Sequence, residues 1–145
     1  MSIFILISAI LYLCLSIFWG IYQAQTISVV PLEDLNSVNI STSDRLSTET
    51  EMTGEVKVDR FEEVSHINIE KIDEVLYIII HKQPAFFSKS TFSINLNDVN
   101  DVDSINKIAI ISGNIYTGKG VERGYSLGDL EKTPDQKIIW EQYVK

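Results

Sequence analysis

Residues suited to acid–base or nucleophilic chemistry are few in this chain. The two histidines are His66, within an alternating segment, and His81, at the end of an apolar run. The single cysteine, Cys14, lies inside the apolar N-terminal run, so residues 15–145 offer no thiol for a disulfide, a metal or a nucleophile. No serine stands in a recognised nucleophile motif, and catalysis needs groups held within hydrogen-bond reach of each other. The sequence therefore predicts no catalytic residues, and an envelope-polymer hydrolase is the least favoured function.

The segment 97–103, which reads NDVNDVD, is a candidate for ion binding. It supplies five side chains with oxygen atoms of the kind that calcium prefers. The order of an EF-hand loop is missing, including the glutamate at its twelfth position. Asn and Asp are also the standard turn residues, because their side chains bond the nearby backbone. We therefore predict a turn without metal or cofactor, and weak ion binding is the alternative.

A glycine-rich segment precedes the C-terminus. Five of the seven glycines fall between Gly113 and Gly128, and the stretch 118–124 reads GKGVERG. Its spacing fits neither G-x-G-x-x-G nor a Walker loop, so it is interpreted as a long loop between strands. Loops do carry function. The side chains here that suit stacking on a ligand or pairing with it are Tyr116, Lys119, Arg123 and Tyr125.

A second candidate binding loop follows Pro84 and contains Phe86, Phe87 and Lys89. The two rings either fold back onto the core or form an exposed patch that grips a partner or the lipid interface. Aromatic and basic side chains on exposed loops often dominate interfaces. Any binding activity is therefore predicted to map to the loops at 84–90 and 115–125.

The charges are unevenly distributed. Residues 1–32 carry none, whereas residues 33–74 carry twelve acids against four bases, which accounts for the whole net charge of −8. Nucleic acid is excluded as a partner, because phosphate binding needs a clustered Lys/Arg surface. The acidic stretch is interpreted as a solvated face, with attraction of cations or of a basic partner as the alternative.

Residues 3–22 form an uncharged apolar run of twenty residues. A helix of that length spans about 30 Å, the thickness of the hydrocarbon core of a bilayer. Trp19 and Tyr22 stand at its C-terminal end, where aromatic side chains favour the interface. An uncleaved anchor in the lipid bilayer is therefore favoured over a cleaved signal. No Lys or Arg precedes Arg45, so nothing basic holds the downstream flank in the cytoplasm, and we expect the C-terminal domain outside it.

Downstream of the anchor the pattern favours strands. The run 75–80 (VLYIII) is typical of a strand buried on both faces, and 91–97 (TFSINLN) alternates cleanly. The predicted organisation is an anchor over 1–22, a tether over 23–36 and an acidic β-rich domain over 37–145. The predicted fold is mainly β, with one N-terminal transmembrane helix followed by a small antiparallel β-sandwich or curled sheet.

The order VLYIII, FFSKS, TFSINL, INKIAI, KIIW over residues 65–141 resembles small membrane-anchored or secreted β-domains of low-GC Gram-positive bacteria, a group of uncharacterised function. The resemblance is one of strand order and implies a β-fold at the cell surface. It carries no site residues.

The predicted function is a single-pass, membrane-tethered, extracytoplasmic interaction or accessory domain without enzymatic activity. Its protein partner is left open. The alternative is a ligand- or ion-binding module that uses the glycine-rich or the Asp/Asn-rich loop.

Overall fold

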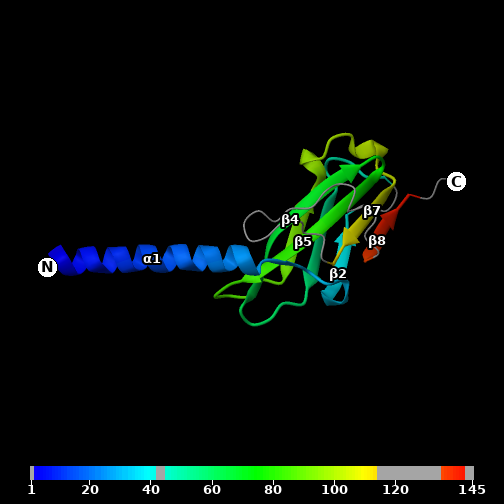
Figure 1. Ribbon diagram of the computed structural model, residues 1–145. Coiled ribbons are helices and arrows are strands. Elements are labelled where there is room, and N and C mark those ends of the chain that lie inside the picture. The colour runs from blue at the N-terminus through cyan, green and yellow to red at the C-terminus, as the bar shows by residue number, and fades with distance from the viewer. Residues whose placement is uncertain (1, 42–44, 114–134, 143–145) are drawn as a thin grey trace.

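The chain folds as one long N-terminal helix followed by two β-sheets (Figure 1). The computed structural model describes residues 2–41, 45–113 and 135–142. Helix α1 runs from Ser2 to Thr26, and its large apolar side chains are exposed. Within the described chain, α1 is the one helix long and apolar enough to cross a membrane, and none of its apolar window is buried against the protein.

The regular elements in the rest of the described chain are eight strands and three single 3-10 turns. The strands are β1 Ser28–Val29, β2 Leu35–Ile40, β3 Glu51–Val56, β4 Glu62–Ile72, β5 Val75–Pro84, β6 Thr91–Asn95, β7 Lys107–Ile111 and β8 Gln136–Glu141. The turns are η1 Leu32–Asp34, η2 Leu96–Asp98 and η3 Val102–Ser104.

Strand β5 is the centre of the larger sheet. The order of the hydrogen-bonded strands is β1-β5-β7-β8, and β4 also pairs with β5. β4 and β5 form a hairpin in which Ile72 pairs with Val75 across a two-residue turn at 73–74. Asp73 has a φ of 52°, a left-handed conformation that Asp tolerates in turns. β7 runs parallel to β5, and the remaining pairs of this sheet are antiparallel.

The smaller sheet has the order β2-β3-β6, is antiparallel, and faces the larger one. The two inner faces share one apolar core, to which β3 contributes Met52 and Val56 and β5 contributes Leu76, Ile78 and Ile80. The opposite face of the larger sheet is also buried, in a second cluster of Tyr77, Ile79, Ala109 and Ile111. The alternating side chains of β5 therefore enter two apolar clusters, as its uninterrupted apolar sequence predicts.

A mainly β fold with one apolar N-terminal helix is confirmed, and two details differ from the expectation. The larger sheet is mixed, because β5 and β7 are parallel. The segment expected as a tether is built into the fold: residues 23–26 extend α1, β1 pairs with β5, and Val30 is 4% exposed. No charge or proline interrupts the helix before Thr26, and Pro31 comes only after β1.

Candidate functional site

The two ends of the β-domain differ in chemistry. The turns η2 and η3, which hold the Asp/Asn-rich segment, lie at the end farthest from α1 (Figure 1). The connections between β3 and β4 and between β5 and β6 lie at the end next to α1. We call these the distal end and the helix end of the domain.

A pocket of about 640 Å³ lies at the distal end. The β4–β5 hairpin and the Asp/Asn-rich segment form it, and its lining residues are Ile69, Lys71, Asp73, Leu76, Asn95, Asp98, Val99, Asn100 and Asp101. Lys71 Nζ lies 3.3 Å from Asp101 Oδ2 across its rim. A hydrogen bond from Ser104 and then the Lys71 ammonium lower the pKa of Asp101 below its usual value.

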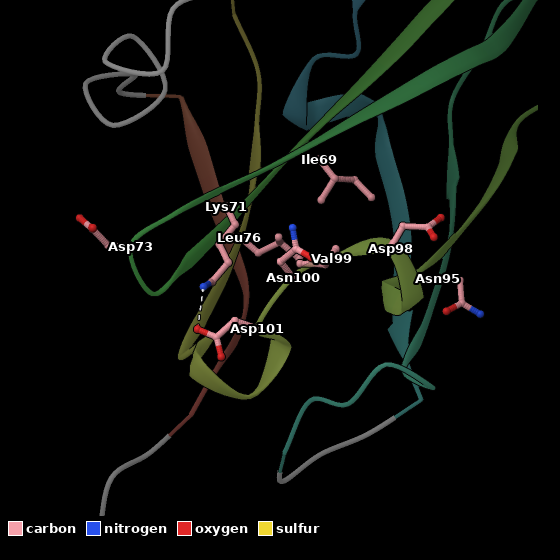
Figure 2. A pocket seen from close by; sticks show the side chains of 9 residues that line it. All are labelled: Ile69, Lys71, Asp73, Leu76, Asn95, Asp98, Val99, Asn100 and Asp101. Carbon is pink, nitrogen blue, oxygen red and sulfur yellow. Dashed lines mark hydrogen bonds and ion pairs between the residues drawn. The ribbon is translucent and has the colours of Figure 1, made fainter.

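The acidic side chains of this pocket do not converge. Figure 2 shows Asp73 and Asp98 at opposite sides of the pocket, while Asp101 turns toward Lys71. Asn95 Oδ1 instead accepts a hydrogen bond of 3.0 Å from the backbone N–H of Asn97. In the described chain no three His, Cys, Asp or Glu side chains are grouped so that they could hold a metal ion. The segment forms turns, as predicted, and its geometry gives no support to the ion-binding alternative.

The two histidines lie together on neighbouring strands. Their rings stack with centroids 4.1 Å apart and planes 11° apart. Ser65 Oγ lies 3.2 Å from His66 Nδ1. His81 is 1% exposed, and burial, with a smaller contribution from the facing His66, lowers its pKa to about 4. Because His81 is buried, its ring is out of reach of a substrate and is not placed to act as a general acid or base.

A polar groove of about 380 Å³ separates β4 from β6. It opens beside the point where the backbone N–H of Val64 donates to the carbonyl of Lys89 at 2.8 Å. His66 and the side chains of Lys89, Thr91 and Ser93 are among its lining residues. Of the predicted binding residues that the structure describes, Lys89 is among the lining of this groove.

At the helix end, the loop after β5 meets α1. The rings of Phe86 and Trp19 stack with centroids 4.6 Å apart and planes 20° apart. The ring centroids of Trp19 and Tyr22 lie 5.8 Å apart. Gln23 Nε2 donates to the carbonyl of Pro84 at 2.8 Å. These contacts fix the end of α1 against β5, because a stacked ring pair and a hydrogen bond hold the same two segments.

Three phenylalanines are exposed at this end. Phe86 and Phe87 are 71% and 87% exposed, so their rings do not fold back onto the core, and the alternative of an exposed pair is observed. Phe61 is 60% exposed on the neighbouring loop, whose carbonyl at Phe61 accepts a hydrogen bond of 2.8 Å from the N–H of Ala85. Sequence reasoning missed Phe61 and the contact with Trp19, since no periodicity relates loops so far apart in the chain.

The predicted binding residues are thus not gathered at one site. Phe86 and Phe87 lie at the helix end, and Lys89 faces the groove. Tyr116, Lys119, Arg123 and Tyr125 lie outside the described residues.

Comparisons with protein-family models, with curated proteins and with solved structures find no match to this chain. The resemblance to surface β-domains of Gram-positive bacteria therefore stays a prediction.

Proposed function

We propose that the chain is a membrane-anchored, non-enzymatic interaction domain, held by α1 in the bilayer with its β-domain on the extracytoplasmic side. The observation that carries the proposal is the solvent-facing apolar surface of α1. Ile3, Phe4 and Ile5 are 75%, 77% and 59% exposed, and as successive residues of a helix they point about 100° apart around its axis. A helix that is apolar all round and not buried by protein needs another apolar surrounding, which a bilayer supplies.

The attachment between α1 and the β-domain supports a working anchor over a leader that is removed. Trp19 and Gln23 contact residues of the loop after β5, and β1 follows directly and pairs with β5. A segment that is cut away gains nothing from specific contacts with the folded domain. The helix and the β-domain are therefore proposed to act as one unit.

The non-enzymatic part of the proposal is supported by the state of the titratable groups. The buried His81 is stacked on His66, and the carboxylates at the distal pocket are separated. A ligand-binding role for the distal pocket has less support, because the Asp101 carboxylate is already occupied by Lys71. An interaction surface has looser geometric requirements than catalysis.

The anchor is tested by replacing Leu11 and Leu13 with Lys in the full chain. Each lysine at the centre of a membrane helix costs about 3 kcal/mol of insertion free energy. We expect the double variant to leave the membrane fraction, whereas the matched Leu11→Ala/Leu13→Ala variant resists extraction by carbonate. A wild-type chain that is found processed and soluble would contradict the proposal.

The side of the membrane is tested with a thiol reagent that does not cross membranes. Ser47→Cys, in a Cys14→Ser background, places one thiol on an exposed loop of the β-domain. Labelling on intact cells is expected. Labelling only after lysis would put the domain in the cytoplasm.

A further inference from the structure

The exposed phenylalanines of the helix end are placed by α1 itself. Phe86 stacks on Trp19, and Phe87 is the next residue along the loop. The loop that carries Phe61 is held beside them by the hydrogen bond from Ala85. We call Phe61, Phe86 and Phe87 the phenylalanine cluster. Figure 1 shows the two loops projecting beside the end of α1.

The position of Trp19 sets the depth of this cluster. Trp19 precedes Tyr22, the last residue of the apolar run, by three residues, which is about 4.5 Å along the axis of a helix. Tryptophan at the end of a membrane helix lies at the level of the lipid headgroups. A ring stacked on Trp19 therefore reaches the same level, and it does so from the β-domain.

We propose that the phenylalanine cluster inserts into the outer edge of the lipid bilayer and forms a second membrane contact, which fixes the tilt of the β-domain on the membrane. The inference rests on the proposed membrane anchoring by α1. It goes beyond that function, because α1 alone, although fixed to the β-domain, leaves the two free to tilt together in the bilayer.

Lipid is favoured over a soluble protein as the partner of this cluster. A protein that covered Phe86 would have to enter the headgroup layer, because Phe86 is held at the level of Trp19. Exposed aromatic rings suit this layer, where apolar surface is removed from water.

The charges near the cluster are mixed: the acids Asp59 and Glu62 flank Phe61, and Lys82 Nζ lies 3.1 Å from Glu62 Oε2. Arg60 lies 5.4 Å from the centre of the Phe61 ring, where its guanidinium can meet lipid phosphates. Acids of the Asp/Asn-rich segment lie at the opposite end, away from the lipid surface (Figure 1). Because the contact is mainly apolar, it does not require anionic lipid.

The experiment measures the depth of single fluorescent labels in the full-length protein. The protein is reconstituted in phosphatidylcholine vesicles that contain lipids with a nitroxide quencher near the headgroup end of the acyl chain. In a Cys14→Ser background, the label is attached at Ser88→Cys beside the cluster, at Tyr22→Cys on α1, or at Ser47→Cys. Ser47 is a distal reference, since its loop joins η2 through the bond from Leu96 N–H to the carbonyl of Thr50.

We expect strong quenching at positions 22 and 88 and none at 47. Quenching at 22 without quenching at 88 would overturn the inference and leave the anchor intact. Loss of quenching at 22 would overturn the proposed membrane anchoring, and the inference with it.

A paired substitution tests the rings themselves. Phe86→Ser/Phe87→Ser, in the protein labelled at position 88, is expected to lose most of the quenching at 88 and to keep it at 22. Ile138→Ser is the matched control, because Ile138 is an exposed apolar side chain (50%) on β8, away from α1. Unchanged quenching in the double variant would show that the rings do not hold the loop at the lipid. Circular dichroism checks that each variant is folded.

Discussion

At the scale of single residues, the buried His81 is expected to make the stability of the domain depend on pH. Its ring is buried and stacked on the ring of His66, and burial first and the facing ring second disfavour a positive charge on it. The pKa of His66 is also lowered by burial. If both rings were protonated, two cations would lie face to face. The stacked arrangement is therefore favoured when the two rings are neutral.

The first prediction concerns stability at low pH. The pKa of His81 is about 4 in the folded chain against 6.5 for an ordinary histidine. The unfolded chain therefore binds more protons between these values, and the free energy of unfolding falls as the pH drops from about 6.5 to 4. The loss is on the order of 2 kcal/mol, because one pKa unit corresponds to about 1.4 kcal/mol and water around His66 screens part of the effect.

Urea unfolding at a series of pH values checks this expectation. His81→Phe removes the titrating group while keeping a buried ring, so its unfolding free energy should depend less on pH between 6.5 and 4. The test compares how the free energy of unfolding changes with pH, and not its value at pH 7. An unchanged pH slope in His81→Phe would show that the carboxylates cause the acid sensitivity.

At the scale of elements, β3 depends on a glycine at its centre. Gly54 pairs with Val38 on β2 and with Phe92 on β6. A Cβ atom at position 54 would lie 2.3 Å from Cζ of Phe92 and 2.6 Å from the carbonyl oxygen of Ser37. The ring of Phe92 thus occupies the space that the glycine leaves open, an arrangement that shields a glycine within a sheet.

We therefore expect Gly54→Ala to lower the free energy of unfolding by about 1–3 kcal/mol, since both the ring and the backbone must shift. Gly20→Ala on α1 is the matched control, because nothing lies within 4 Å of its new methyl group. Combining Gly54→Ala with Phe92→Leu should cost less than the sum of the two changes. Additive costs would show that the ring does not cause the crowding.

The central strand supports a third prediction. Ile79 is fully buried in the second apolar cluster, whereas Ser47 is exposed on the loop before β3. Ile79→Asp should unfold the domain, because an unpaired carboxylate would be buried at a cost of several kcal/mol. Ser47→Asp should change the free energy of unfolding by less than about 0.5 kcal/mol. Chemical denaturation of both variants measures the difference, and equal effects would contradict the placement of β5.

How much of these elements can be predicted from sequence depends on how local their signals are. The run 75–80 identifies β5 because six apolar residues in succession, five of them β-branched or aromatic, suit a strand covered on both faces. The parallel pairing with β7 is invisible, since side-chain alternation does not encode strand direction. β1 has two residues, too few to show a period. Pro84 predicts the loop that carries Phe86, but the stacking on Trp19 follows only from the folded chain.

At the scale of the whole molecule, the chain is arranged along one axis. α1 lies at one end with the phenylalanine cluster beside it. The turns η2 and η3, which hold the Asp/Asn-rich segment, lie at the other end (Figure 1). The carboxylates of the Asp/Asn-rich segment therefore lie away from the end that is proposed to face lipid, whereas Asp59 and Glu62 flank Phe61 at that end. The connection between α1 and the β-domain is short, because the chain crosses from α1 into β1 within two residues.

The last prediction tests this boundary with two deletions. Removing residues 1–26 takes away α1 but keeps β1 and Val30, whose N–H donates to the carbonyl of Ile80 at 2.9 Å. The shortened chain should be soluble and folded. Removing residues 1–31 also deletes the β1 pairing with β5 and a side chain that is 4% exposed, so its free energy of unfolding should be lower by about 2 kcal/mol or more. Urea unfolding compares the two, with Val30→Ala in the first deletion as an intermediate case. Equal stability of the two deletions would show that residues 27–31 act as a tether, and a gap between them places the start of the domain at β1.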